Sequence, residues 1–183
     1  VINMMVGREL DRSAISVPTY TEEVLLEVRD LCGPGYEHIS FDVRKGEIVA
    51  FSGLIGAGRS EVMSTIFGAA KRTAGEIRLK GKPVRFRSPA DAIHQGIAMV
   101  QEDRKVLSLF MDLPIAHNVS MAQLPRMTRT GTINHRRERS LVNDFVKQLD
   151  VRLASISNAV GSLSGGNQQK TVLARWLATL PKL

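Results

Sequence analysis

Residues 53–61 combine glycines, a cation and a hydroxyl at a spacing that can hold phosphate groups. They read Gly-Leu-Ile-Gly-Ala-Gly-Arg-Ser-Glu, which fits the phosphate-loop pattern except that Arg59 replaces the expected lysine. Glycines let successive backbone N–H groups face phosphate oxygens, and the N-terminus of a following helix adds positive potential. We expect Ser60 to bind Mg²⁺ through its hydroxyl. The predicted binding residues are Gly53, Gly56, Ala57, Gly58, Arg59, Ser60 and Glu61.

Arg59 is the departure from this pattern. A guanidinium keeps the positive charge, but it is larger and planar, whereas a lysine ammonium is a compact donor. We therefore expect nucleotide binding to survive the replacement better than hydrolysis does. The alternative is a glycine-rich turn between strand and helix that binds no ligand. An apolar run before the loop and a helix pattern after it favour binding.

A second glycine-rich motif lies near the other end of the sequence. It comprises Leu163, Ser164, Gly165, Gly166, Asn167 and Gln168. A Ser-Gly-Gly turn that opens a helix presents backbone donors and a positive helix end to an anion. Taken alone, this motif is more simply explained as an ordinary capped helix start.

Together the two motifs resemble the nucleotide-binding domain of ATP-binding cassette (ABC) transporters, whose signature loop is LSGGQ. More narrowly, GLIGAGRSE, EDRK at 102–105, LSGGNQQK and MVGRELD at 5–11 are similar to the second cassette of duplicated ATPase subunits. Those subunits energise bacterial importers of ribose, galactose and xylose. The resemblance implies an α/β P-loop NTPase fold, with a β-rich N-terminal part that carries the phosphate loop and a mainly helical subdomain.

The resemblance also implies ligands and partners. ATP and Mg²⁺ would be the cofactors, and the signature would face the ATP held by an opposite cassette. Gln101 and Glu102 are both candidates for the Q-loop, which senses nucleotide and contacts the membrane-spanning permease. We expect no nucleic-acid partner and a peripheral location on the cytoplasmic face of the inner membrane.

The resemblance further implies that the catalytic groups lie beyond these residues. In cassettes, the carboxylates of the Walker B strand directly follow the signature helix, and the switch histidine lies further on. The sequence ends at Leu183, so we expect a fragment without catalytic residues that binds nucleotide weakly and does not hydrolyse it.

Three other interpretations stay open. The net charge of +7 is compatible with a soluble cassette protein, or another P-loop NTPase, that acts on ribosomes or nucleic acid. Alternatively, an apolar strand at 97–100 would carry a magnesium-binding carboxylate at Asp103. In the third interpretation, Arg59 has ended catalysis and the cassette is purely structural or regulatory.

The periodicity of the chain predicts the elements that position these motifs. Strands are expected at 25–31, 39–43, 47–52 and 97–100, with a hairpin at 73–84 that turns at Lys80 and Gly81. Helices are expected after the phosphate loop and at 89–95, 115–124, 135–149 and 167–180. We divide the chain into an inter-cassette linker (1–23), a β-rich phosphate-loop part (24–102), a helical subdomain (103–162) and the signature loop and helix (163–183).

Composition excludes several other classes of protein. With 43% apolar and 23% charged residues among 183, the chain is neither a disordered tail nor a collagen. Cys32 is the only cysteine, so no disulfide can form within the chain. The four histidines show no metal-ligand spacing. Tyr36 is more consistent with shielding a sheet edge than with stacking on adenine.

Overall fold

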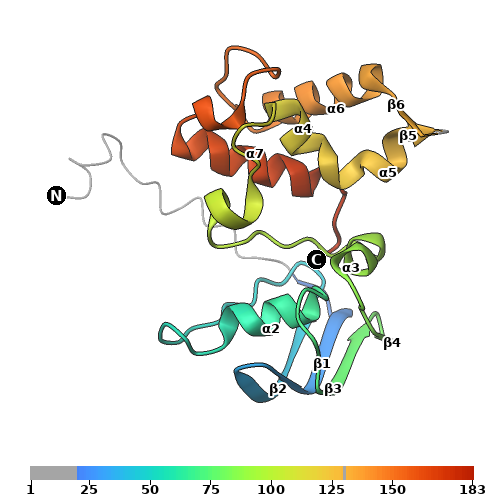
Figure 1. Ribbon diagram of the computed structural model, residues 1–183. Coiled ribbons are helices and arrows are strands. Elements are labelled where there is room, and N and C mark those ends of the chain that lie inside the picture. The colour runs from blue at the N-terminus through green and yellow to red at the C-terminus, as the bar shows by residue number, and fades with distance from the viewer. Residues whose placement is uncertain (1–19, 130) are drawn as a thin grey trace. The chain divides into compact units, whose positions relative to one another are not determined.

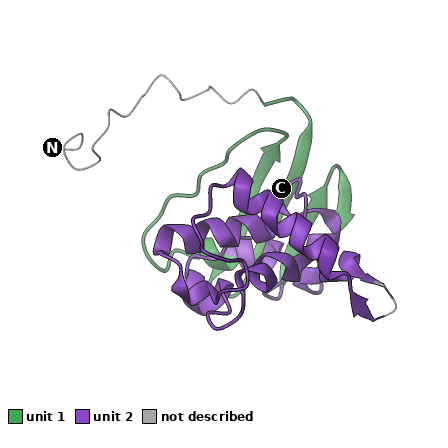
Figure 2. Cartoon of the chain, turned by 90° about the horizontal axis from the view of Figure 1, so that it is seen from above, with its two compact units in different colours: residues 1–61, 72–85 green, residues 62–71, 86–183 purple. Residues whose placement is uncertain are grey.

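The computed structural model describes residues 20–129 and 131–183 (Figure 1). Most of the predicted linker and the MVGRELD segment therefore lie outside the described residues. The chain divides into two compact units, residues 1–61 with 72–85, and residues 62–71 with 86–183 (Figure 2).

The first unit contains a four-stranded antiparallel sheet in the order β2-β1-β3-β4. Its strands are β1 (Val24–Gly33), β2 (Tyr36–Arg44), β3 (Ala74–Leu79) and β4 (Lys82–Val84). Central strand β1 buries Leu26, Val28 and Leu31, each at most 3% exposed. The strands predicted at 25–31 and 39–43 are thus confirmed, with longer bounds.

The predicted hairpin at 73–84 is also confirmed. Lys80 and Gly81 join β3 to β4 with φ angles of 52° and 73°. Positive φ at both central residues is typical of the two-residue turn that matches the twist of antiparallel strands.

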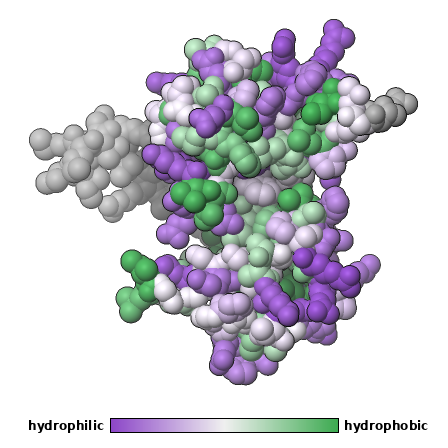
Figure 3. Space-filling model, in the orientation of Figure 1, coloured by the Kyte–Doolittle hydropathy of each residue, from purple (hydrophilic) through white to green (hydrophobic). Residues whose placement is uncertain are grey.

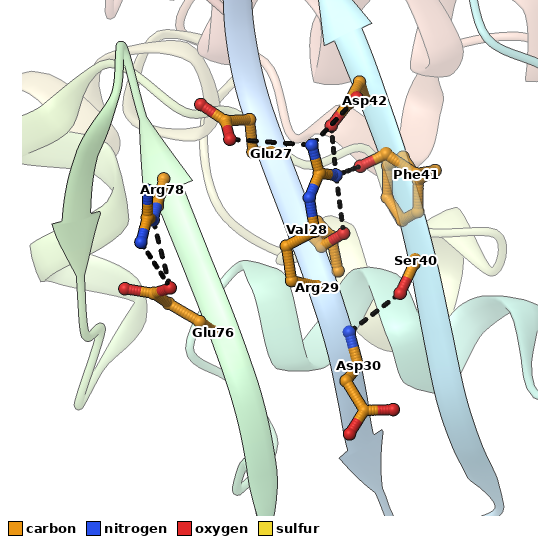
Figure 4. A network of polar contacts seen from close by, with 9 residues as sticks. All are labelled: Glu27, Val28, Arg29, Asp30, Ser40, Phe41, Asp42, Glu76 and Arg78. Carbon is orange, nitrogen blue, oxygen red and sulfur yellow. Dashed lines mark hydrogen bonds and ion pairs between the residues drawn. The ribbon is translucent and has the colours of Figure 1, made fainter.

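Charged side chains link neighbouring strands on the exposed face of this sheet (Figure 4). Arg29 donates to both carboxylate oxygens of Asp42, with 3.0 Å between Nη2 and Oδ2. The Asp30 amide donates to the Ser40 hydroxyl at 2.8 Å. Exposed ion pairs contribute little to stability, so the buried apolar residues of β1 dominate the free energy of this sheet.

The strand predicted at 47–52 is wrong. These residues form no strand, and Ile48 is 80% exposed. Phe51 instead packs edge-on against Phe41, with 4.8 Å between ring centroids. An apolar run becomes a buried strand only when neighbouring strands hydrogen-bond to it. In the described part of this unit, no strand of the sheet pairs with 47–52.

The second unit is mainly helical. Its elements are α3 (Pro89–Gln95), the π-helical turn η2 (Arg104–Ser108), α4 (Ile115–Ser120), η3 (Met121–Gln123), α5 (Leu124–Met127), a short hairpin of β5 (Thr128–Arg129) and β6 (Thr132–Ile133), α6 (His135–Gln148), η4 (Val160–Ser162) and α7 (Gly165–Leu177). Helices α4, α6 and α7 pack around a core that includes Ile115, Val142 and Val172. Helix α2 (Arg59–Ile66) runs from the first unit into the second.

The helices follow the sequence pattern closely. Helix α3 has the predicted bounds: Ser88 caps its start in a capping box with Asp91, and Gly96 ends it with φ 89°. Helix α6 ends one residue before its predicted end. The segment predicted as one helix at 115–124 is divided among α4, η3 and α5, and the last helix lies at 165–177 instead of 167–180.

The strand predicted at 97–100 is also wrong. Only Ile97 in this segment is buried, at 4% exposed. Backbone hydrogen bonds connect the start of this segment to the last two residues: Lys182 N and Leu183 N donate to Gly96 O at 2.6 and 3.2 Å, and Ala98 N donates to Leu183 O at 2.9 Å. The two bonds of Leu183 follow the parallel pattern, but one residue paired in this way is too little to form a strand.

Candidate functional site

The phosphate loop is an open turn between residue 53 and the start of α2. Gly56 and Gly58 have φ angles of 83° and 82°, and the Ala57 amide donates to the Leu54 carbonyl at 3.1 Å. Leu54 and Ile55 project outward and are 86% and 101% exposed. Within residues 20–61 and 72–85, no hydrogen-bond acceptor is found for the amides of Ile55, Gly56 and Gly58. These amides are therefore available to an anion.

The turn between β1 and β2 supports this loop from one side. A Cβ at Gly58 would lie 2.9 Å from the Gly35 carbonyl oxygen and 3.1 Å from Tyr36 Cβ. Because Gly58 also has positive φ, both its backbone and its surroundings require glycine. By contrast, a Cβ at Gly56 would meet no atom within 4 Å. The loop is thus tightly packed at Gly58 and open at Gly56.

The ring of Tyr36, on edge strand β2, is buried against the end of β1. It is 8% exposed, and its hydroxyl has no hydrogen-bond partner in the described residues. The ring lies close to Gly33, where an added Cβ would approach the hydroxyl to 2.6 Å. So little of the ring is exposed that it has little area for contact with a base.

Helix α2 brings the polar residues of the motif to the surface. Arg59, Ser60 and Glu61 form its first turn, and all three are exposed. The Ser60 hydroxyl and the Arg59 guanidinium are therefore accessible to a ligand at the positive end of α2.

The signature residues open helix α7 in the second unit. Ser164 is the N-cap residue, and its hydroxyl accepts a hydrogen bond from Asn167 Nδ2 at 3.0 Å instead of from the helix backbone. The first turn holds no acidic residue. Gln168 is 4% exposed and donates through Nε2 to the Leu163 carbonyl at 3.0 Å.

Arg104, which the sequence analysis did not select as a site residue, lies against this turn. Its Nε donates to Gln168 Oε1 at 3.3 Å, and its Nη2 lies 2.9 Å from the position of a Cβ at Gly165. Its place in the EDRK segment was the only sequence signal, since 64 residues separate Arg104 from Gln168.

Arg175 is a buried residue of α7 that the sequence analysis did not single out. It is 6% exposed and donates through Nε and Nη2 to the carbonyl and side-chain oxygens of Asn118, at 2.6 and 3.0 Å. Nη1 donates to the Ser108 carbonyl. Burial lowers the pKa of Arg175, and no carboxylate in the described residues forms an ion pair with it. Its position on the buried face of α7, beside Val172 and Ala174, was the available signal.

The two Q-loop candidates lie between α3 and η2. Gln101 is half-buried, with Nε2 3.6 Å from the sulfur of Met99, and Glu102 is exposed. The next residue, Asp103, caps η2 by accepting from the Lys105 and Val106 amides at 2.9 and 3.1 Å. Because 97–100 forms no strand, the alternative magnesium site at Asp103 loses the element on which it depended.

Residues 20–129 and 131–183 contain no group of three His, Cys, Asp or Glu side chains arranged to hold a metal ion. Nor do they contain a helix both long enough and apolar enough to span a bilayer.

Comparisons with known proteins identify the family of this chain. The family model described as "ABC transporter" matches residues 36–183. The ribose import ATP-binding protein RbsA of Rhodococcus jostii is 42% identical over 100% of this chain and 37% of its own length. RbsA 1 of Agrobacterium fabrum is also 42% identical, over 100% of this chain and 36% of its own length. The chain thus spans little more than a third of the curated relatives it matches.

Solved structures show the same fold at lower sequence identity. The ATP-binding cassette MJ0796, in a dimeric post-hydrolysis state with ADP and Pi, aligns with TM-score 0.70 and 20% identity. That alignment covers 86% of this chain and 71% of the other. CbiO1 of Clostridium perfringens aligns with TM-score 0.66 and 20% identity, over 87% of this chain and 63% of the other. Because the family model matches most of its length, this chain belongs to the ABC transporter family, and it has the P-loop NTPase fold of an ABC cassette.

Proposed function

We propose that these residues are part of the ATP-binding subunit of an ABC importer for sugars, which couples ATP binding and hydrolysis to transport. The observation that carries this proposal is the 42% identity to ribose import ATP-binding proteins over the whole chain. The alternatives, a soluble cassette or another P-loop enzyme acting on nucleic acid, have no comparable support. The particular sugar is not part of the proposal.

The phosphate loop is the proposed site for the ATP phosphates. The amides at 55, 56 and 58, for which residues 20–61 and 72–85 provide no acceptor, the open space at Gly56 and the exposed cation at Arg59 fit a polyanion. Ser60 would hold Mg²⁺ through its hydroxyl, and the bound metal would neutralise charge on the phosphates. Gly53, Ala57 and Glu61 complete the proposed binding set. Arg59 would attract the phosphates by charge but lacks the compact donor geometry of lysine.

Leu163 to Gln168 are proposed to face nucleotide held by an opposite cassette. The first turn of α7 carries free N–H groups and no acidic side chain, which favours approach of a phosphate. We place no catalytic carboxylate in this chain and propose that turnover requires residues outside it. We also retain the division into a linker (1–23), a β-rich part (24–102), a helical subdomain (103–162) and the signature segment (163–183).

An apolar surface beside the Q-loop candidates supports a permease partner. Val106, Leu107 and Phe110 are 77%, 62% and 56% exposed. The space-filling view shows strongly hydrophobic side chains gathered over the yellow-green helical turn of Figure 1 (Figure 3). Large apolar side chains that are exposed next to one another are typical of protein interfaces. We therefore propose peripheral attachment to a permease at the cytoplasmic face of the membrane.

The proposal is tested with the intact ATPase polypeptide and its permease in liposomes. We expect Mg²⁺-dependent ATP binding that single-stranded nucleic acid does not displace, together with ATP-dependent uptake of labelled monosaccharide. Tight nucleic-acid binding that falls steeply with salt, without sugar uptake, would instead support the non-transport alternative.

A further inference from the structure

We propose that Arg104 is a positioning residue for the signature turn, residues 163–168, and transmits the position of η2 to it through Gln168. This inference rests on the proposed function, because it assigns a role within the proposed signature site. The contacts that carry it all lie in the second unit.

The first step is a chain of two hydrogen bonds. Arg104 Nε donates to Gln168 Oε1 at 3.3 Å, and Gln168 Nε2 donates to the Leu163 carbonyl at 3.0 Å. Gln168 is only 4% exposed, so water cannot readily replace either partner. The guanidinium thus fixes the amide of Gln168, and that amide fixes the carbonyl at the start of the signature turn.

The second step is the close approach of Arg104 to Gly165. Nη2 lies 2.9 Å from the position of a Cβ at Gly165, so a side chain at this signature residue would displace the end of the guanidinium. No carboxylate in the described residues pairs with Arg104, and the first turn of α7 is free of acidic residues. A cation beside the positive end of a helix is unfavourable, and an approaching anion relieves that repulsion. Arg104 therefore favours the phosphate-bearing state of the site.

The third step is that both ends of η2 are attached to α7. Arg104, the first residue of η2, contacts Gln168, and the carbonyl of Ser108, the last residue, accepts from Arg175 in the same helix α7. Val106 and Leu107 lie between these attachments and are exposed. A displacement of this apolar surface by a partner would move Arg104 and, through Gln168, the signature turn.

The test compares Arg104→Gln, Gln168→Leu and the double variant in the intact polypeptide assembled with its permease. Loss of one charge-assisted hydrogen bond predicts a kcat about tenfold lower for Arg104→Gln, with the ATP KM changed less than about twofold. The double variant should be no worse than the poorer single variant, since both break the same chain of contacts. Arg136→Gln, which removes an equally charged but exposed side chain of α6, is the control and should retain wild-type kcat.

A second measurement does not depend on turnover. Hydrogen exchange of the peptide covering 163–172 should be about tenfold faster in Arg104→Gln, with the peptides of α6 unchanged. An equal rise across α6 would mean general destabilisation and would overturn the positioning role. Three other results would also overturn the positioning role. They are unchanged exchange at 163–172, additive effects of the two substitutions, and wild-type kcat in Arg104→Gln. A wild-type protein that neither binds nor hydrolyses ATP would refute the proposed function, while the exchange result would still decide whether Arg104 positions the turn.

Discussion

Replacing Gly58 with alanine tests the packing that shapes the phosphate loop. Two costs add at this position. The positive φ of 82° costs an L-residue about 1–2 kcal/mol. The new methyl group would also lie 2.9 Å from the Gly35 carbonyl oxygen and 3.1 Å from Tyr36 Cβ, and overpacking of this kind costs roughly 1–3 kcal/mol. We therefore expect Gly58→Ala to lower the free energy of unfolding by roughly 2–5 kcal/mol.

Gly56→Ala is a matched control for this prediction. Gly56 has nearly the same φ, 83°, but its added methyl group would meet no atom within 4 Å. It should therefore lose only the backbone term of about 1–2 kcal/mol. Urea denaturation of the purified variants, followed by circular dichroism, measures both values. Equal destabilisation by the two substitutions would show that the contact with the β1–β2 turn does not constrain the loop.

Three further substitutions test the helical unit. Arg175→Met should lower the free energy of unfolding by about 2–4 kcal/mol, because the buried carbonyls of Asn118 and Ser108 lose their donor. Urea denaturation measures this change, and a smaller loss would show that water replaces the guanidinium. Ser88→Ala should cost about 1 kcal/mol by removing the cap of α3, and thermal unfolding identical to wild type would contradict this. Burial raises the pKa of Glu138, but hydrogen bonds from Ser120 and His135 outweigh it, so the pKa lies below the ordinary value of 4.5. The stability that this carboxylate provides is present above pH 4.5 and is lost as pH falls through the lowered pKa, so the stability difference between wild type and Glu138→Gln should narrow on acidification. A difference that stays constant from pH 7 to pH 3 would contradict that assignment.

Local chemistry made several elements predictable from the sequence. The bounds of α3 follow from Ser88, Pro89 and Gly96, each of which acts within one turn of the helix. The β3–β4 turn follows from Lys80 and Gly81, because positive φ at adjacent positions is itself a local property. The order of phosphate loop, helical segment and signature likewise identified the cassette without reference to packing.

The two strand predictions at 47–52 and 97–100 depended on distant partners. Both segments are apolar, and the sequence pattern therefore favoured burial on two faces. A strand is nevertheless defined by hydrogen bonds to neighbours, and composition does not reveal whether those neighbours are in place. The structure leaves Ile48 exposed, and 96–98 hydrogen-bond to the end of α3 and to Lys182 and Leu183 without forming a strand.

The sequence by itself determined the family, the two glycine-rich motifs and the bounds of α3 and, within one residue, α6, because spacing and capping act over a few residues. Only the tertiary structure decided that Gly58 packs against the β1–β2 turn and that Arg104 contacts the signature residue Gln168. It also decided that Arg175 is buried without an ion pair to any carboxylate of the described residues. These contacts join residues that are far apart in the chain, and a side chain's partner across such a distance is set by how the elements pack.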